Sequence, residues 1–149
     1  MEWKLKKFNE LTNWELYSIL QLRSEVFIVE QNCVYLDLDG KDATAWHLMG
    51  MINEKLAAYT RLLPPGISYD DPSIGRVVTS KSERGAGIGR RLMHESIEHC
   101  KTLFGERSIT LGAQVYLQKF YESLGFMQIG KEYIEDGIPH IRMTRKFSS

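Results

Sequence analysis

The sequence predicts a mixed α/β fold (α+β) in one domain that spans residues 1–149, and three observations lead to that prediction. A length of 149 residues fits one domain, because compact domains usually hold about 100–200 residues. Hydrophobic residues make up 43% of the chain, which is enough apolar mass for a core. The predicted elements run strand, helix, three strands, helix, strand, helix and two strands, so the sheet begins and ends antiparallel and is no repeated βαβ array.

The first two predicted elements are an edge strand and a long helix. Residues 3–8 alternate between apolar and polar side chains, which indicates a strand. Thr12 or Asn13 is a suitable N-cap for a helix that we expect to run from about residue 12 to about residue 30. Within that helix, Arg23 alone interrupts the apolar stripe.

The central part of the chain predicts a loop and three strands. Residues 32–44 carry several aspartates and a glycine, and we expect them to form a loop. Residues 46–52 and 56–63 are strand-like runs joined by a hairpin turn. Residues 74–79 are rich in β-branched side chains and predict a further strand.

The last part of the chain predicts two helices and three strands. An apolar face at helical spacing predicts a helix over residues 88–104. Residues 108–111 are a short strand, and a shorter helix over about 115–124 ends at Gly125, a residue suited to the left-handed position after a helix. Residues 127–147 predict two strands around a turn.

Composition narrows the classes of function. The chain has 19 basic and 19 acidic residues and a net charge of zero, which argues against a nucleic-acid partner. Cys33 and Cys100 cannot form a disulfide scaffold, and His94 and His99 lie too far around their predicted helix to share a metal ion, so we expect no metal site. No membrane-spanning run or secretory signal is visible, and we expect a reduced, cytoplasmic protein with no membrane partner.

A glycine-rich turn follows the strand at residues 74–79 and precedes a helix. The first amides of a helix have no acceptor within it, and the helix dipole adds positive charge there. Glycines let the backbone approach an anion closely. Residues 76–91 contain five basic residues against Glu83 alone, a net charge of +4. The turn therefore predicts a site for a small polyanion, whereas glycines alone would only allow tight packing of strand and helix.

The glycine spacing excludes two common phosphate loops. No Lys-Ser/Thr pair follows the glycines, and their G-x-G-x-G spacing is not that of a dinucleotide-binding turn. The loop reads R-x-x-G-x-G over residues 84–89, and the chain resembles the GCN5-related N-acetyltransferases (GNAT), in which this loop holds the pyrophosphate of acetyl-CoA. Residues 120–126, with a tyrosine four residues before Gly-Phe, extend the resemblance. Residues 29–31, 37–42 and 135–140 are similar to the ElaA-like branch of that family.

The resemblance implies a mixed central sheet of about seven strands with antiparallel ends, a V-shaped splay between the fourth and fifth strands, and helices on both faces. It also implies that acetyl-CoA, as acetyl donor, is held by the strand before the loop and by the loop itself. These cofactor-binding residues are Val77, Val78, Thr79, Arg84, Gly85, Ala86, Gly87, Ile88, Gly89 and Arg90. The Val78 backbone amide is the expected donor to the thioester oxygen.

Tyr121 is the candidate general acid, at the position where the GNAT resemblance places a tyrosine. When an amine attacks the thioester, a CoA thiolate must leave, and a phenol with a pKa of about 10 is well matched to protonate that sulfur. The alternative is that Tyr121 only packs in the core beside Phe120 and Phe126, as aromatic residues commonly do.

The acceptor side is less clear in the sequence. Residues 30–42 and residues 132–140 each carry a net charge of −3, and they would attract a cationic amine if both flank the acyl slot; otherwise they are solvated loops. Candidate bases are Glu30, Asp37, Asp39, His47, Glu83 and His140. Of these we single out His140, as a base or as a contact of the acceptor, against a structural role.

These observations together predict direct transfer of an acetyl group from acetyl-CoA to an amine on a small molecule or a peptide. One alternative is a non-catalytic, CoA-binding regulatory module of the same fold. Others are an unrelated nucleotide-binding loop and a partner-binding domain without a ligand. Dimerisation is frequent in the GNAT family, so a homodimer is an expectation of the resemblance and of no sequence feature. The sequence does not indicate which amine is acetylated.

Overall fold

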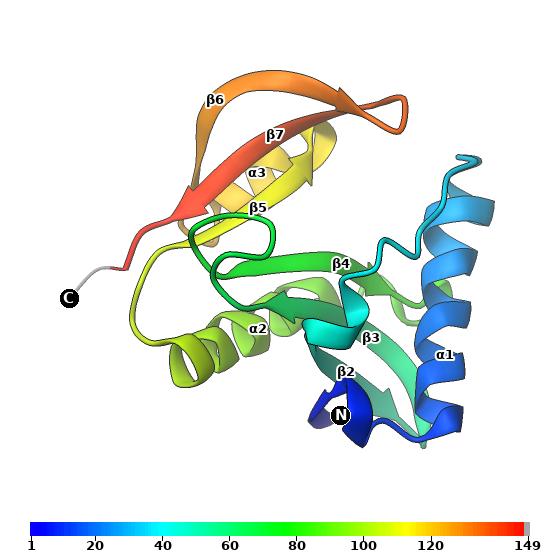
Figure 1. Ribbon diagram of the computed structural model, residues 1–149. Coiled ribbons are helices and arrows are strands. Elements are labelled where there is room, and N and C mark those ends of the chain that lie inside the picture. Colours follow the sequence, from blue (N-terminus) through cyan, green and yellow to red (C-terminus); the bar gives the residue numbers. More distant parts are fainter. Residues whose placement is uncertain (148–149) are drawn as a thin grey trace.

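The structure is a computed structural model that describes residues 1–147. Its seven strands form one sheet in the order β1-β2-β3-β4-β5-β7-β6 (Figure 1). The strands are β1 (Glu2–Lys7), β2 (Trp46–Ile52), β3 (Lys55–Leu63), β4 (Ser73–Thr79), β5 (Ile109–Gln114), β6 (Phe126–Glu135) and β7 (Ile138–Arg145). The helices are α1 (Asn13–Arg23), the π-helical segment η2 (Ser24–Glu30), α2 (Ile88–Phe104) and α3 (Gln118–Glu122). This order confirms the predicted mixed α/β class.

The sheet opens between β4 and β5. These two strands run parallel, whereas every other neighbouring pair is antiparallel. Their ladder has one register pair, Ser73 with Thr110, near the beginning of both strands. Beyond that pair β4 and β5 diverge toward their carboxyl ends, and the β6–β7 hairpin arches over the gap (Figure 1). The predicted V-shaped splay is confirmed.

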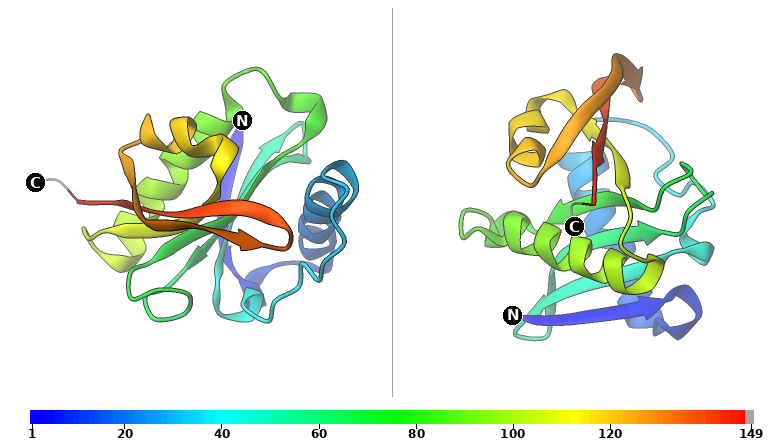
Figure 2. Two further views of the ribbon diagram at one scale, coloured as in Figure 1. Left: turned by 90° about the horizontal axis from the view of Figure 1, so that it is seen from above. Right: turned by 90° about the vertical axis from the view of Figure 1, so that its left-hand side faces the viewer.

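Helices cover both faces of the sheet (Figure 2). Side chains alternate along a strand, so successive residues of β3 face opposite sides. Tyr59 packs in one cluster with Ile19 of α1, while Ala58 packs in another with Leu92 of α2. The phosphate loop predicted from the sequence lies at the beginning of α2, at the carboxyl end of β4.

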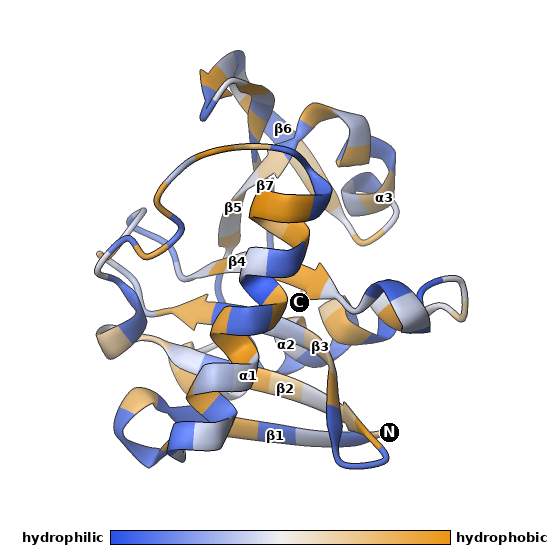
Figure 3. Cartoon of the chain, turned by 90° about the vertical axis from the view of Figure 1, so that its right-hand side faces the viewer, coloured by the Kyte–Doolittle hydropathy of each residue, from blue (hydrophilic) through white to orange (hydrophobic). Residues whose placement is uncertain are grey.

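The first helix begins at the predicted cap but changes type before it ends. The Glu15 amide donates to Thr12 Oγ1 at 3.1 Å and the Thr12 amide donates back to Glu15 Oε1 at 2.9 Å, a capping box. After Arg23 the hydrogen bonds reach back five residues, as from the Gln31 amide to the Val26 carbonyl at 3.1 Å. The helix predicted from about residue 12 to about residue 30 thus has its expected extent, but its last seven residues are π-helical and not α-helical. Figure 3 shows α1 and this mostly hydrophobic final turn facing the viewer.

The strand predicted over residues 108–111 is longer in the structure because of its partner. β5 continues to Gln114, which pairs with His140 of β7. The hairpin that supplies β7 lies later in the chain, so local sequence does not reveal this extension. The helix predicted at about 115–124 begins as a 3-10 turn over Val115–Leu117 and continues as α3.

None of the helices in residues 1–147 is long and apolar enough to cross a membrane.

Candidate active site

A cleft of about 880 Å³ occupies the opening between β4 and β5. Its walls come from η2, the loop after it, β4, the beginning of α2, β5, α3 and the tip of the β6–β7 hairpin. Five of the ten predicted cofactor-binding residues line it, and these are Val77, Val78, Thr79, Arg84 and Gly89. The opening that the topology creates is therefore a real cavity that includes much of the predicted donor site.

Strand β4 is bulged where it faces the cleft. Between the register pairs Tyr59–Val78 and Arg61–Gly75, β4 contains one residue more than β3. Arg76, within this bulge, has a left-handed backbone with φ of +50°. A bulge bends its strand and re-aims side chains. Gly75, directly before the arginine, is the local signal for it, because a glycine within a strand often marks a bulge.

The glycine-rich loop forms the beginning of α2. Gly85 and Gly87 have φ of +94° and +74°, which favours glycine, and Gly87 is the N-cap of the helix. A Cβ at either position would meet nothing within 4 Å, so backbone conformation and not lack of space calls for glycine. Both residues, with Ala86 between them, are exposed at the rim of the cleft. An anion at the first amides of α2 would have open access.

Two of the predicted cofactor-binding residues are engaged within the protein. Ile88 is buried, at 4% exposure, and packs beside Leu92 in the core. Arg90 donates from Nη2 to Ser123 Oγ at 2.7 Å, which directs this guanidinium toward the end of α3. Neither side chain lines the cleft. The contact with the acetyl donor that the sequence predicts at Ile88 would therefore involve its backbone amide and not its side chain.

Arg84 is held by Glu30, the last residue of η2. Both terminal nitrogens of Arg84 donate to this carboxylate, Nη2 at 2.9 Å from Oε2, and Nη2 also donates to the Thr79 carbonyl at 3.1 Å. The hydrogen bonds from Arg84 lower the pKa of Glu30 below its usual range. Glu30, one of the candidate bases, is therefore a weak base in this arrangement.

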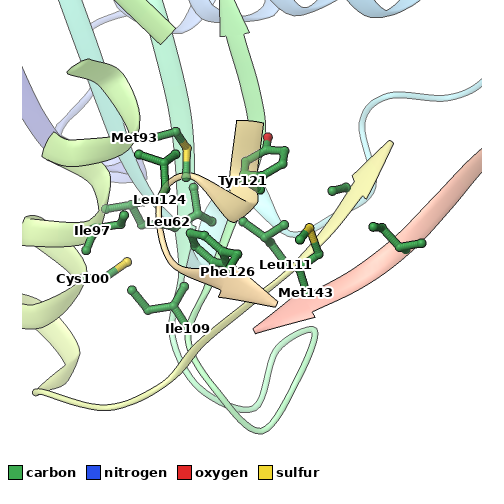
Figure 4. Close-up of a cluster of buried hydrophobic side chains, with 13 residues drawn as sticks. Leu62, Met93, Ile97, Cys100, Ile109, Leu111, Tyr121, Leu124, Phe126 and Met143 are labelled. Carbon is green, nitrogen blue, oxygen red and sulfur yellow. The ribbon is translucent and has the colours of Figure 1, made fainter. Parts of the chain in front are cut away.

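Tyr121 of α3 lies between the core and the cleft. Its ring is 5% exposed and packs edge-on against Phe120 and Phe126, with ring centroids 5.2 Å and 5.9 Å away. Figure 4 shows its hydroxyl directed away from the neighbouring core side chains Leu111 and Phe126. Burial raises the pKa of Tyr121, because a phenolate would lose solvation there. Tyr121 is therefore both a core residue and a lining residue of the cleft.

The negative charge counted over residues 30–42 is neutralised in the structure by ion pairs. Three aspartates of the loop are paired with three arginines that come from α1, β3 and β4. The pairs are Arg23–Asp37 and Arg23–Asp42 at 2.8 Å, Arg61–Asp39 at 2.7 Å, Arg61–Asp42 at 3.1 Å and Arg76–Asp37 at 2.7 Å. The expectation that this segment would attract a cation through a net charge of −3 is therefore wrong.

The hairpin tip supplies the second acidic segment. Glu135 and Asp136 line the cleft, and the Asp136 carbonyl accepts a hydrogen bond from Cys33 Sγ at 3.2 Å, so the hairpin tip contacts the loop after η2. His140 does not line it: Nδ1 donates to the Ile138 carbonyl at 2.7 Å, and the ring stacks on Tyr133 with centroids 5.7 Å apart. Any role of His140 toward the acceptor stays a prediction, and would need its side chain to leave this stack.

The other candidate bases are also engaged or remote. His47 is fully buried, with Nδ1 2.6 Å from the Tyr59 hydroxyl, and burial lowers its pKa. Asp37 and Glu83 do not line the cleft. Asp39 does, but its carboxylate accepts two hydrogen bonds from Arg61, each at 2.7 Å. None of the six candidates is thus an unengaged base within the cleft.

The sequence reading missed the aromatic lining and the role of Arg23. Phe27, Tyr69 and Tyr116 line the cleft, but they lie on three separate segments and share no spacing. Arg23 did carry a signal, because an arginine within an apolar stripe must find acidic partners once it is buried. The aspartates that follow it in the loop are those partners.

A sheet opened at its parallel pair, with a glycine-rich loop capping the next helix and a tyrosine at the cleft, defines the GNAT class of acyltransferases. The sequence model of the family described as "Acetyltransferase (GNAT) domain" matches residues 26–147 of this chain. The chain therefore belongs to the GNAT family, and within it to the ElaA-like branch.

Relatives and solved structures agree with this placement. The chain is 43% identical to Protein ElaA of Escherichia coli over 148 residues, which cover 98% of this chain and 97% of that protein. The crystal structure of Escherichia coli ElaA superposes with a TM-score of 0.88 at 44% identity, covering 97% of this chain and 99% of that one. An acyl-CoA N-acyltransferase from Pseudomonas aeruginosa gives a TM-score of 0.91 at 41% identity, with the same coverage of 97% and 99%.

A more distant structure shares the fold alone. Aminoglycoside 6'-N-acetyltransferase complexed with coenzyme A has a TM-score of 0.72 at 15% identity, covering 98% of each chain. At that identity the likeness concerns architecture and leaves the acceptor undetermined.

Proposed function

We propose that this chain transfers the acetyl group of acetyl-CoA directly to an amine, with Tyr121 as general acid and the Val78 amide as donor to the thioester oxygen. The observation that supports this most is that one cleft brings together β4, the glycine-rich loop and Tyr121, which are separated in sequence. Membership of the GNAT family, whose members bind acyl-CoA, makes acetyl-CoA the first donor to test.

The residues present fit such a donor. Gly85 and Gly87 turn the chain into the beginning of α2 with φ above zero, and the space beside both residues is open, which suits a pyrophosphate at the first amides of the helix. The divergence of β4 from β5 leaves room for an extended chain to lie beside Val77 to Thr79. Acetyl-CoA would supply an activated thioester, whose carbonyl carbon is open to attack by an amine.

Tyr121 is suited to hold a proton until the thiolate leaves. The phenol is protonated at neutral pH because its usual pKa of about 10 lies well above 7, and burial raises that pKa further. Its hydroxyl lies at the cleft while its ring is fixed between Phe120 and Phe126, so the donor oxygen is positioned without a flexible side chain. In the proposed reaction the neutral amine nitrogen bonds to the acyl carbon, the carbon–sulfur bond breaks, and the Tyr121 proton passes to the sulfur. The nitrogen then loses a proton to solvent, and Tyr121 regains one from solvent, so the products are the amide, free CoA thiol and the original phenol.

The acceptor we propose is an amine on a small molecule or a peptide. Glu135 and Asp136 line the cleft and present negative charge there, whereas Asp39 is already matched by Arg61. The amine must lose a proton before it attacks, and none of the engaged side chains described above is assigned to that step. The expectations of a homodimer and of a single domain over residues 1–149 stay predictions.

Calorimetry with acetyl-CoA, and with ATP for comparison, tests the proposal. We expect acetyl-CoA to bind and ATP to bind far more weakly. Gly87→Glu should abolish acetyl-CoA binding, because it places a carboxylate where the pyrophosphate would lie and a side chain where φ is +74°. Preference for ATP, or no binding of acetyl-CoA by a folded protein, would contradict the proposal. Thiol release in the presence of a panel of amines then identifies the acceptor.

A further inference from the structure

The ion pair between Glu30 and Arg84 joins two walls of the cleft. Glu30 ends η2, and Arg84 lies in the glycine-rich loop, 54 residues further along the chain. Both side chains line the cleft, and their exposed fractions are 34% and 36%. The contact is therefore open to solvent and to whatever enters the cleft.

This contact occupies the arginine that the proposed function needs. Both terminal nitrogens of Arg84 are directed at the Glu30 carboxylate. The Glu30 carboxylate accepts from the edge formed by Nη1 and Nη2, and Thr79 accepts at the other edge, at Oγ1 from Nε at 3.4 Å and at its carbonyl from Nη2 at 3.1 Å, so both edges of the guanidinium are engaged. Arg84 can bind a pyrophosphate through the same nitrogens only after Glu30 has given way.

Exchange of one anion for the other is energetically feasible. An exposed ion pair contributes little to stability, so a ligand with two negative phosphates can outcompete one carboxylate. The two other bonds of Arg84, from Nη2 to the Thr79 carbonyl at 3.1 Å and from Nε to Thr79 Oγ1 at 3.4 Å, would hold the arginine near the carboxyl end of β4 during the exchange. Arg84 then needs only a local change of its side chain.

Glu30 also lies in a wall of the cleft that its release from Arg84 could change. Phe27, Glu30 and Gln31 all line the cleft, and they belong to the π-helical turn or follow it directly. Single π-helical turns are frequent at functional sites, where they adjust the aim of side chains. A change of partner at Glu30 can thus alter the part of the cleft lining that an entering CoA molecule would contact.

We propose that Glu30 is an internal competitor for the donor's pyrophosphate, which holds Arg84 in the donor-free protein and lowers its affinity for CoA. The inference rests on the proposed function and deepens it, because it assigns a regulatory role within the donor site. Binding of CoA replaces the Glu30 carboxylate at Arg84 and frees the end of η2.

Isothermal titration with CoA tests this inference in a double-mutant cycle. Glu30→Gln removes the competing charge and should tighten CoA binding about two- to fivefold, the range expected for an exposed ion pair. Arg84→Gln should weaken binding, and adding Glu30→Gln to it should then change nothing. Glu83→Gln is the matched control, because it removes a negative charge next to Arg84 although Arg84 pairs with Glu30 instead.

Glu30→Asp provides a second test that keeps the charge. The shorter side chain cannot reach both nitrogens of Arg84 in the present arrangement, so a tightening smaller than that of Glu30→Gln is expected. Thermal melting confirms that each variant is folded before titration.

Three results would overturn the inference: a Glu30→Gln variant that binds CoA no better than the parent, a Glu83→Gln variant that tightens binding equally, or a Glu30 effect that persists without Arg84. If the parent protein itself does not bind CoA, the proposed function fails as well. A parent that binds CoA with an unchanged Glu30→Gln variant contradicts only the competition.

Discussion

The two halves of the cleft are built in different ways. The donor half, where we propose that acetyl-CoA binds, depends on one continuous segment from Val77 to Gly89, in which the backbone conformation of the glycines shapes the loop. The acceptor half, where we propose that the amine enters, depends on side chains that meet only after folding, such as Asp39 of the loop after η2 with Arg61 of β3. Arg23, Asp37 and Asp42 belong to the same network of ion pairs but do not line the cleft. Function can therefore be read from local sequence in one half and not in the other.

The difference matters most for charge. In the donor half, a local count gave +4 over residues 76–91, but Arg76 belongs to the aspartate network and Arg84 is paired with Glu30. In the acceptor half, a local count gave −3 over residues 30–42, and arginines from distant elements cancel it. Charge summed along a segment predicts a site only when its partners lie in the same segment.

The largest expected effect comes from breaking the network at Arg23. Arg23→Met removes the fully buried guanidinium that bridges Asp37 and Asp42, leaves each aspartate with one arginine in place of two, and should lower the free energy of unfolding by about 3–5 kcal/mol, measured by urea denaturation. Lys6→Met is the control, because its pair with Glu15 has a 31% exposed lysine and should cost no more than about 1 kcal/mol. Equal losses in the two variants would show that the network is not a distinct structural unit.

In the donor half, two glycine substitutions should change the free energy of unfolding by smaller amounts and in opposite directions. Gly87→Ala places a side chain at φ of +74° and should lower the free energy of unfolding by about 1–2 kcal/mol. Gly89→Ala lies within α2, where a Cβ would meet only Phe120 at 3.9 Å, and should raise it by about 0.5 kcal/mol. A stabilising Gly87→Ala would contradict the view that backbone conformation selects glycine there.

The smallest expected effect is acid sensitivity of the acceptor half. Burial opposes ionisation of Asp39, but the hydrogen bonds from Arg61 outweigh it, and the pKa of Asp39 falls well below its usual range. A lowered folded pKa contributes stability that is present above the unfolded value of about 3.9 and is lost as pH falls below it. Carboxyl NMR titration of Asp39 should show this low pKa, and a value at or above 3.9 would refute the pairing.

Periodicity and turn residues predicted the order of elements, a cap at Thr12 or Asn13, of which Thr12 is the cap, and the left-handed Gly125. They did not predict the extension of β5, because it depends on pairing with β7 later in the chain, nor the π-helical turn or the bulge at Arg76. In the site, residues with a local motif were found. Residues whose role depends on a partner far along the chain, such as Arg23, were not.

The central claim is that the cleft is an acetyl-transfer site in which Tyr121 donates a proton. Tyr121→Phe tests it most directly, because the ring stays in its packing between Phe120 and Phe126 while the hydroxyl is lost. With an acceptor identified by the amine panel, we expect kcat to fall by about 10²–10⁴-fold while the Kd for acetyl-CoA changes by less than about twofold. Unchanged turnover, or a loss of affinity as large as the loss of turnover, would contradict the claim.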